Sequence, residues 1–237
     1  MNRWTARGAQ AAVALLLVAA ALAVTGPAAT PAPGPGRLDV VSSAQPTEAN
    51  PTERDRVYDV RLTGTADLDA HAVATSSAGC DGCRGVATTV QVIVGTPGAA
   101  RADNVATAWS RCAHCRASAV SLQVVVLTTA GPVVAANRSL AVTAGCVRCK
   151  AAAGAYQTVV VAKDAWLSSA AARGALDTWA RDQARAQLTQ VAARVGGSMA
   201  RQQDTATASG LGRLRSLLEQ DAGVRVLKVK GVVRLDR

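Results

Sequence analysis

Three copies of one motif dominate the sequence. In each copy a Cys-x-x-Cys is followed at once by a basic residue, then by an Ala four residues and a Gln eight residues after the second Cys. The copies align without gaps over Gly79–Val94, Arg111–Val126 and Gly145–Val160. Their first cysteines stand at positions 80, 112 and 146, so the spacings are 32 and 34 residues. A period of this length indicates a repeat architecture, in which small supersecondary units stack on one another to bury a common core.

Each unit is predicted to consist of a strand, a Cys-x-x-Cys turn and a second strand. The Gln of each copy leads into a β-branched run, and a weaker alternating stretch precedes each cysteine pair, at 72–75, 104–109 and 139–143. Alternation of this kind is typical of half-buried strands. Loops are expected over 95–104 and 128–137, and further strands at 38–41 and 58–62. We expect antiparallel hairpin repeats that form a sandwich, a barrel or a stacked array.

The hydrophobic period changes after Val161. Apolar residues then recur mostly every three and four positions over 164–202, which predicts an amphipathic helix with Asp164 as its N-cap. A second helix is predicted at 212–221 and a final strand at 224–235. The expected fold is therefore mainly β with a C-terminal helical segment, α+β overall. Residues 37–163 form the β domain, and 164–237 form the helices and last strand.

Residues 1–36 are expected to lie outside the fold. Arg3 and Arg7 precede an unbroken apolar run at 11–24, and small residues and prolines follow it. This order is typical of a secretory signal peptide followed by a Pro/Gly-rich linker. The apolar run has 14 residues, fewer than the roughly 20 that a membrane-spanning helix needs. An uncleaved signal-anchor is the alternative, in which case residues 10–25 contact the membrane. Either way the chain is expected to be secreted or anchored to the outer face of the cytoplasmic membrane.

Composition shows why the cysteines matter for stability. The chain is 49% hydrophobic but only 3% aromatic, with no Phe. Alternating Ala and Val are expected to pack as a thin, close interface. Such small side chains bury little apolar area, and burial stabilises a fold by about 25 cal/mol per Å² of apolar area. Outside the cytoplasm cysteines are oxidised, and a bridge closing a four-residue loop contributes about 2 kcal/mol. We predict three local structural disulfides, which use all six cysteines: Cys80, Cys83, Cys112, Cys115, Cys146 and Cys149.

Two other chemistries stay open for the cysteines. Paired Cys-x-x-Cys knuckles can hold zinc, although three knuckles leave one that only His71 or His114 could complete. A thiol-disulfide redox site centred on Cys112 and Cys115 is the other, because His114 between them would lower a thiol pKa. No His-Glu-x-x-His, Walker loop or Gly-x-Ser-x-Gly occurs in the sequence. A non-enzymatic protein with no cofactor is therefore expected.

The charge balance limits the choice of partner. The formal net charge is +10, distributed as +2 over 1–36, −1 over 37–64, +4 over 65–163 and +5 over 164–237. Aromatic residues do not alternate with the basic ones, which argues against nucleic acid as the partner. A basic surface outside the cytoplasm favours anionic lipid or cell-wall polymer. The expected partner is a cell-envelope component or an unidentified protein.

The repeat also resembles a known sequence pattern. The residues that carry this resemblance are Cys112, Cys115, Ala119 and Gln123–Val125 in the second copy, and Cys146 through Gln157 in the third. They are similar to the Cys-x-x-Cys repeat region of actinobacterial peptide zinc metalloprotease proteins. The resemblance covers 66–185. The protease part of that family, with its zinc-binding His-Glu-x-x-His and membrane spans, has no counterpart here. The resemblance implies a free-standing repeat module that acts beside an export or peptide-processing system.

Overall fold

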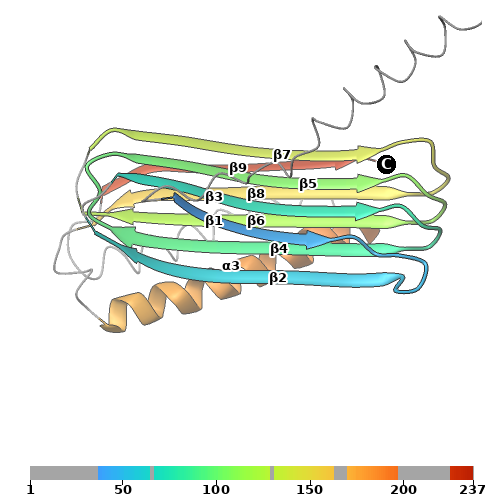
Figure 1. The fold of residues 1–237 in the computed structure, drawn as a ribbon, viewed down its shortest axis with the longest axis horizontal. Helices are drawn as coiled ribbons and strands as arrows, with labels where there is room; N and C mark the ends of the chain where they lie inside the picture. Colours follow the sequence, from blue (N-terminus) through green and yellow to red (C-terminus); the bar gives the residue numbers. More distant parts are fainter. Residues whose placement is uncertain (1–36, 65–66, 129–130, 163–169, 197–224, 237) are drawn as a thin grey trace, which may run out of the picture. The chain divides into compact units, whose positions relative to one another are not determined.

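The computed structural model describes residues 37–64, 67–128, 131–162, 170–196 and 225–236 (Figure 1). These residues form mainly strands with one long helix, as predicted. The first half of the fold contains β1 (Arg37–Ala44), β2 (Thr52–Thr63), β3 (Leu68–Ala78), β4 (Arg84–Gly95) and β5 (Ala100–Ser110). The second half contains β6 (Arg116–Leu127), β7 (Val133–Thr143), β8 (Lys150–Val161), α3 (Ala170–Gly196) and β9 (Arg225–Asp236).

The strands form two stacked sheets rather than antiparallel hairpins. One sheet has the order β1-β3-β5-β7 and the other β2-β4-β6-β8-β9. Every pair within them is parallel except β8 with β9. The antiparallel prediction is therefore wrong. Each Cys-x-x-Cys turn carries the chain from one sheet to the other, so that a strand pairs with its counterpart in the next unit. The fold is a two-sheet β-solenoid.

The sequence repeat and the strand register coincide. Gln91 pairs with Gln123, and Gln123 with Gln157, so equivalent residues form columns across the sheet. The solenoid has one coil more than the three cysteine repeats, because β1 and β2 pair with β3 and β4 in the same parallel sense. In this first coil residues 45–51 take the place of a Cys-x-x-Cys turn. The predicted loops are also shorter than expected, since β5 begins at Ala100 and β7 at Val133.

Small side chains hold the two sheets close together. Near the cysteine turns the interior is lined almost wholly by alanines, such as Ala78, Ala106 and Ala119, all with no exposed surface. A Cβ added to Gly85 would lie 2.5 Å from the Oγ of Ser76 and 3.3 Å from a carbonyl oxygen of β1. Larger residues, including Ile93 and Leu127, fill the opposite end. The predicted thin Ala/Val interface is thus observed.

Helix α3 covers the outer face of the second sheet. Leu176, Trp179, Ala184 and Val191 pack against valines and leucines of β4, β6 and β8, which are consequently buried on both faces. The helix and the last strand confirm the predictions for these segments. Asp164, the predicted helix at 212–221 and the N-terminal segment 1–36 lie outside the described residues. Within the described ranges, no helix combines the length and the apolar character needed to cross a membrane.

Candidate functional site

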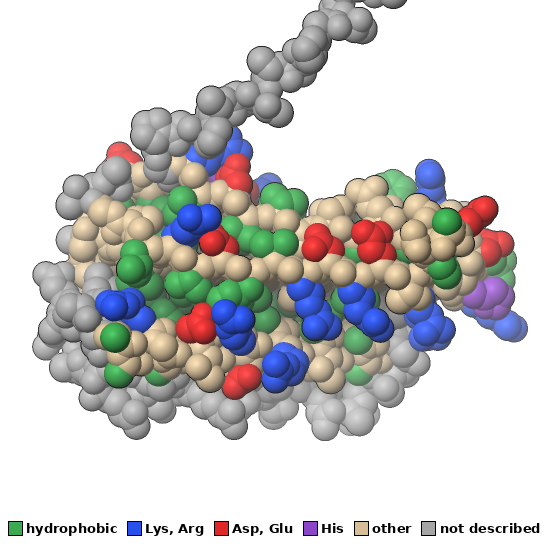
Figure 2. Space-filling model, turned by 60° about the horizontal axis from the view of Figure 1, so that its bottom comes forward, with side chains coloured by type: hydrophobic (Ala, Val, Ile, Leu, Met, Phe, Trp, Pro, Cys, Tyr) green, Lys and Arg blue, Asp and Glu red, His purple; other side chains and the backbone are tan. Residues whose placement is uncertain are grey.

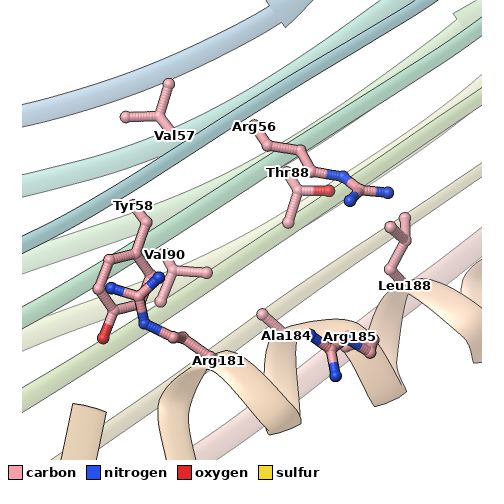
Figure 3. Close-up of a pocket in the computed structure, with 9 residues that line it drawn as sticks. All are labelled: Arg56, Val57, Tyr58, Thr88, Val90, Arg181, Ala184, Arg185 and Leu188. Atoms are coloured by element: carbon pink, nitrogen blue, oxygen red, sulfur yellow. The ribbon is translucent and has the colours of Figure 1, made fainter. Parts of the chain in front are cut away.

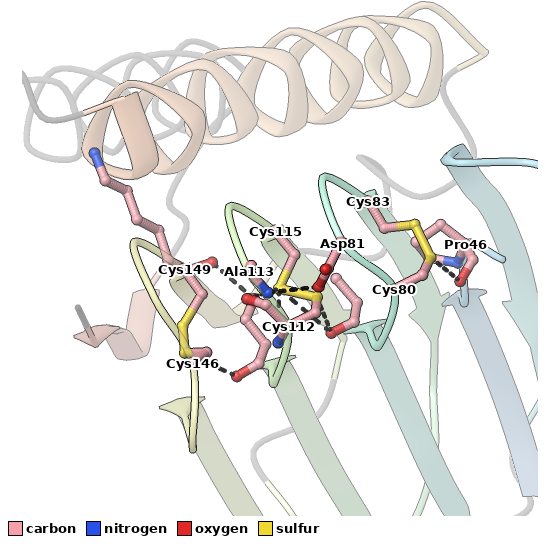
Figure 4. Close-up of a disulfide and its surroundings, with 12 residues drawn as sticks. Pro46, Cys80, Asp81, Cys83, Cys112, Ala113, Cys115, Cys146 and Cys149 are labelled. Atoms are coloured by element: carbon pink, nitrogen blue, oxygen red, sulfur yellow. Dashed lines mark hydrogen bonds between the residues drawn. A yellow bond between two sulfur atoms is a disulfide. The ribbon is translucent and has the colours of Figure 1, made fainter. Parts of the chain in front are cut away.

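The three Cys-x-x-Cys turns stack side by side along one edge of the solenoid, where strands of one sheet lead into the other (Figure 4). Cys80 faces Cys83, Cys112 faces Cys115 and Cys146 faces Cys149, with Cα atoms 5.3, 5.6 and 5.9 Å apart and the two sulfurs of each pair at bonding distance. The second cysteine of every pair is buried. The structure therefore places each predicted pair where a local disulfide requires it, and every bridge lies within its own turn.

The backbone conformation of the turns explains their sequence. The residue before the second Cys has a positive φ in each turn: 71° at Gly82, 57° at His114 and 53° at Arg148. Glycine adopts this region without strain, whereas other residues do so at a cost. Adjacent turns are also hydrogen-bonded to each other, because the N–H of Gly82 donates to the carbonyl of Ala113 (2.8 Å) and the N–H of His114 to that of Val147 (2.8 Å). The turns thus form a continuous ladder.

The cysteine turns differ from a typical redox or zinc site. A reactive thiol usually lies at a helix N-terminus or beside a cation in a partly open position, whereas Cys115 has no exposed surface and Cys112 only 6%. His114 is exposed on the turn itself. His71 lies near the start of β3, with its Nε2 3.1 Å from a carboxylate oxygen of Asp69. The seven residues that follow His71 in β3 span about 23 Å, so the structure does not bring His71 to the cysteines.

A buried column of glutamines ties the two sheets together. Gln123 Nε2 donates to Gln91 Oε1, and Gln157 Nε2 to Gln123 Oε1, both at 2.7 Å. The amides also reach the opposite sheet, since Gln91 donates to the carbonyl of Leu38 (2.9 Å) and Gln157 to that of Ala102 (3.0 Å). Buried amides need such partners. The regular spacing of Gln in the three copies therefore serves a structural purpose.

A pocket of about 230 Å³ opens between β2 and α3 (Figure 3). Arg56 and Tyr58 reach it from the strand, and Arg181 and Arg185 from the helix; Val57, Thr88, Val90, Ala184 and Leu188 complete its lining. The guanidinium carbon of Arg181 lies 3.8 Å from the centre of the Tyr58 ring. This arrangement combines an apolar floor with three cations.

Tyr58, Asp177 and Arg181 form a hydrogen-bonded group at one side of the pocket. The Tyr58 hydroxyl donates to a carboxylate oxygen of Asp177, and Arg181 Nε donates to the other at 3.1 Å. Burial, together with the neighbouring carboxylate, raises the pKa of Tyr58 well above its usual value. Desolvation pushes the pKa of Asp177 upward, but the bonds from Tyr58 and Arg181 outweigh it, so this pKa lies below its usual value. The group anchors the helix to β2.

Basic side chains continue from the pocket across the outer face of the sheet. Arg84, Arg116 and Lys150 stand in register on β4, β6 and β8, each directly after its cysteine pair. Arg54 and Arg56 point to the same face, because side chains alternate along a strand and Tyr58 is on the helix side. Seen from the side of β2 and α3, basic side chains form a row beneath acidic ones (Figure 2). None of these five cations has an ion pair among the described residues.

Two acidic residues of β2 accept hydrogen bonds from the backbone at the end of β1. Glu53 accepts a hydrogen bond from the N–H of Gln45 (2.7 Å), and Asp55 accepts one from the N–H of Ser43 (2.6 Å). Both N–H groups belong to the free edge of β1 or to the residue just after it. The carboxylates therefore satisfy an open sheet edge, a common protection against edge-to-edge pairing. Among the residues that the structure describes, they do not pair with Arg54 and Arg56 on the opposite face of β2.

The sequence pattern predicts the cysteine pairs but not the pocket. The pocket needs β2 and α3, which are more than a hundred residues apart. The available signal was the placement of Arg54, Arg56 and Tyr58 on one face of an alternating strand. Comparison with models of protein families, with curated proteins and with solved structures finds no match for this chain.

Proposed function

We propose that the protein is an exported, non-enzymatic structural and interaction module, whose stacked repeats are fixed by three short-range disulfides. The observation that carries this proposal is the in-register stack of three cysteine pairs. An export signal at 1–36 would place the pairs in an oxidising compartment. In such a compartment the bridges would hold each turn in its positive-φ conformation and stiffen a core made of small side chains.

The buried surroundings of the sulfurs support a structural role. Cys83 and Cys115 have no exposed surface, and the sulfur of Cys112 lies 3.2 Å from the carbonyl oxygen of Ala78. A partner thiolate would need to reach these atoms for exchange to occur. By the resemblance to the repeat region of peptide zinc metalloprotease proteins, the module would act beside an export or peptide-processing system at the cell surface.

A thiol-disulfide function centred on Cys112 and Cys115 is the alternative, favoured by the exposed His114 on the same turn. Both proposals can be tested by mass spectrometry of the exported protein, digested with and without reduction. Six blocked cysteines, joined within each Cys-x-x-Cys, support the structural role. Free thiols, or zinc in the intact protein, contradict it.

Trapping then separates the two remaining functions. A Cys115→Ala variant leaves Cys112 as an unpaired thiol, which in a redox protein captures its substrate as a mixed disulfide. A Cys83→Ala variant, which unpairs Cys80 in a turn without His, is the matched control. We expect neither variant to capture a specific partner. A partner held by the Cys115→Ala variant alone would establish the redox function.

A further inference from the structure

We propose that the arginine-lined pocket and the adjoining row of cations bind an anionic phosphodiester polymer of the cell envelope. The inference rests on the proposed extracytoplasmic function and names the ligand class that this module would take. Here "basic row" means Arg54, Arg56, Arg84, Arg116 and Lys150, on the outer face of β2, β4, β6 and β8.

The geometry of the basic row favours a chain over a single ion. Arg84, Arg116 and Lys150 are neighbours across three adjacent strands, which lie about 4.8 Å apart. Arg54 and Arg56 extend the row along β2 toward Arg181 and Arg185. The cations thus form a bent line instead of converging on one point. A flexible polymer with one negative charge per unit can contact such a line at several places in succession.

The pocket at the end of this line accepts one small group. Its volume of about 230 Å³ is below the roughly 300–1,000 Å³ of sites for drug-sized ligands. Guanidinium groups bind phosphate in a bidentate manner, and the pocket has one on its strand side, Arg56, and another on its helix side, Arg185 (Figure 3). The apolar floor, formed by Val90, Ala184 and Leu188, suits the carbon skeleton of a polyol or sugar unit. A phosphorylated polyol therefore matches both parts of the lining.

Two competing anions fit this surface less well. Single-stranded nucleic acid needs aromatic faces on which bases stack, and the ring of Tyr58 is already covered by Arg181. Stable binding to an anionic membrane combines electrostatic attraction with apolar or aromatic side chains that enter the interface. The exposed apolar residues of β2, Val60 and Leu62, lie at the end of the strand away from Arg54 and Arg56.

The proposal can be tested by fluorescence anisotropy with a labelled glycerol-phosphate oligomer and the full chain with intact cysteine pairs. Arg56→Gln, Arg84→Gln and Arg116→Gln are combined in one variant. Each lost surface contact is expected to weaken binding about threefold, so the triple variant should bind on the order of 30-fold more weakly. The salt dependence of binding should also become less steep, because fewer counterions are released.

A matched control removes the same number of charges from the other sheet. Arg37→Gln, Arg101→Gln and Arg138→Gln change only the outer face of β1, β5 and β7, and binding should fall by less than about threefold. Thermal unfolding of both variants checks that they are folded. Equal weakening in the two variants would mean that the attraction is a diffuse effect of net charge, and would overturn the proposal.

Competition experiments identify the ligand class. Inorganic phosphate at the same phosphate concentration should displace little of the oligomer, since it contacts one point of the row. The proposal is wrong if free phosphate competes as well as the oligomer, or if oligothymidylate or phosphatidylglycerol vesicles bind more tightly than the glycerol-phosphate oligomer. These outcomes leave the disulfide mapping unaffected, so failure here is distinguishable from failure of the proposed structural function.

Discussion

Replacing the middle glutamine of the buried column should destabilise the protein more than replacing the last one. In Gln123→Met the side chain keeps its approximate volume but loses its amide. Gln91 Oε1 then loses its donor, and Gln157 Nε2 keeps only its bond to Ala102. A buried acceptor without a partner costs about 1–3 kcal/mol and a lost hydrogen bond about 1 kcal/mol. We therefore expect the free energy of unfolding to fall by about 3 kcal/mol.

The end of the column should respond differently. In Gln157→Met the Oε1 of Gln123 loses its donor, but the Oε1 of Gln157, which is buried without a partner among the described residues, disappears as well. The two effects partly cancel, so the expected cost is about 1 kcal/mol. Changing Gln91, Gln123 and Gln157 to Met together removes donors and acceptors at once. That variant should lose markedly less stability than the sum of the three single changes.

Equilibrium unfolding in guanidinium chloride, followed by far-UV circular dichroism, measures these differences. The cysteine pairs must be equally oxidised in all variants, which thiol titration verifies. Leu122→Met, on the neighbouring position that faces the helix, is the control and should cost less than about 1.5 kcal/mol. Equal losses at Gln123 and Gln157, or strict additivity in the triple variant, would show that the glutamines do not act as one column.

Three further changes test other parts of the structure. Tyr58→Phe should lower the free energy of unfolding by about 1 kcal/mol. The folded pKa of Asp177 is depressed, so the stability that this carboxylate contributes is present above the usual carboxyl pKa and is lost as pH falls through the folded pKa. An acid titration of the variant should therefore show a smaller loss of stability than that of the parent. Cys112→Ala combined with Cys115→Ala should cost about 2 kcal/mol, by the loop-closure argument, in denaturant unfolding against the oxidised parent. His114→Gly should instead stabilise the chain by about 0.5 kcal/mol, because glycine adopts the positive φ of 57° without strain; a lower midpoint in calorimetry would contradict this.

The sequence predicts the elements of this fold well but not how the strands pair. Alternation along β3 and β5 is clear, and the structure confirms these strands, the repeat spacing and the helix. Side chains alternate with a period of two in parallel and antiparallel sheets alike, so the pattern alone cannot show that a Cys-x-x-Cys turn leads into the opposite sheet. The first coil is not visible as a repeat in the sequence, because it lacks the Cys-x-x-Cys and because β2 carries Asp59 where the later coils carry Gln.

The candidate site illustrates the same limit. The cysteine pairs were predictable because each is local, separated by two residues. The pocket was not, because Tyr58 and Arg181 meet only when α3 crosses the outer face of the sheet. The net charge of each segment likewise does not predict where the basic side chains gather on the surface. The basic residues are dispersed along the chain, and it is the strand register that gathers Arg84, Arg116 and Lys150 into neighbouring positions.

The direction in which α3 runs has a consequence for how such a protein can change in size. The helix lies roughly along the strands (Figure 1), and its 27 residues span about 40 Å, close to the length of a 12-residue strand. An additional coil inserted between β6 and β7 would therefore widen the sheets sideways without requiring a longer helix. The number of strands in each sheet can therefore grow by internal duplication, one coil at a time, whereas the length of the strands is limited by the length of the helix. A duplicated segment would also add one more cation beside Arg116, so the capacity for a long ligand would grow in step with the number of coils.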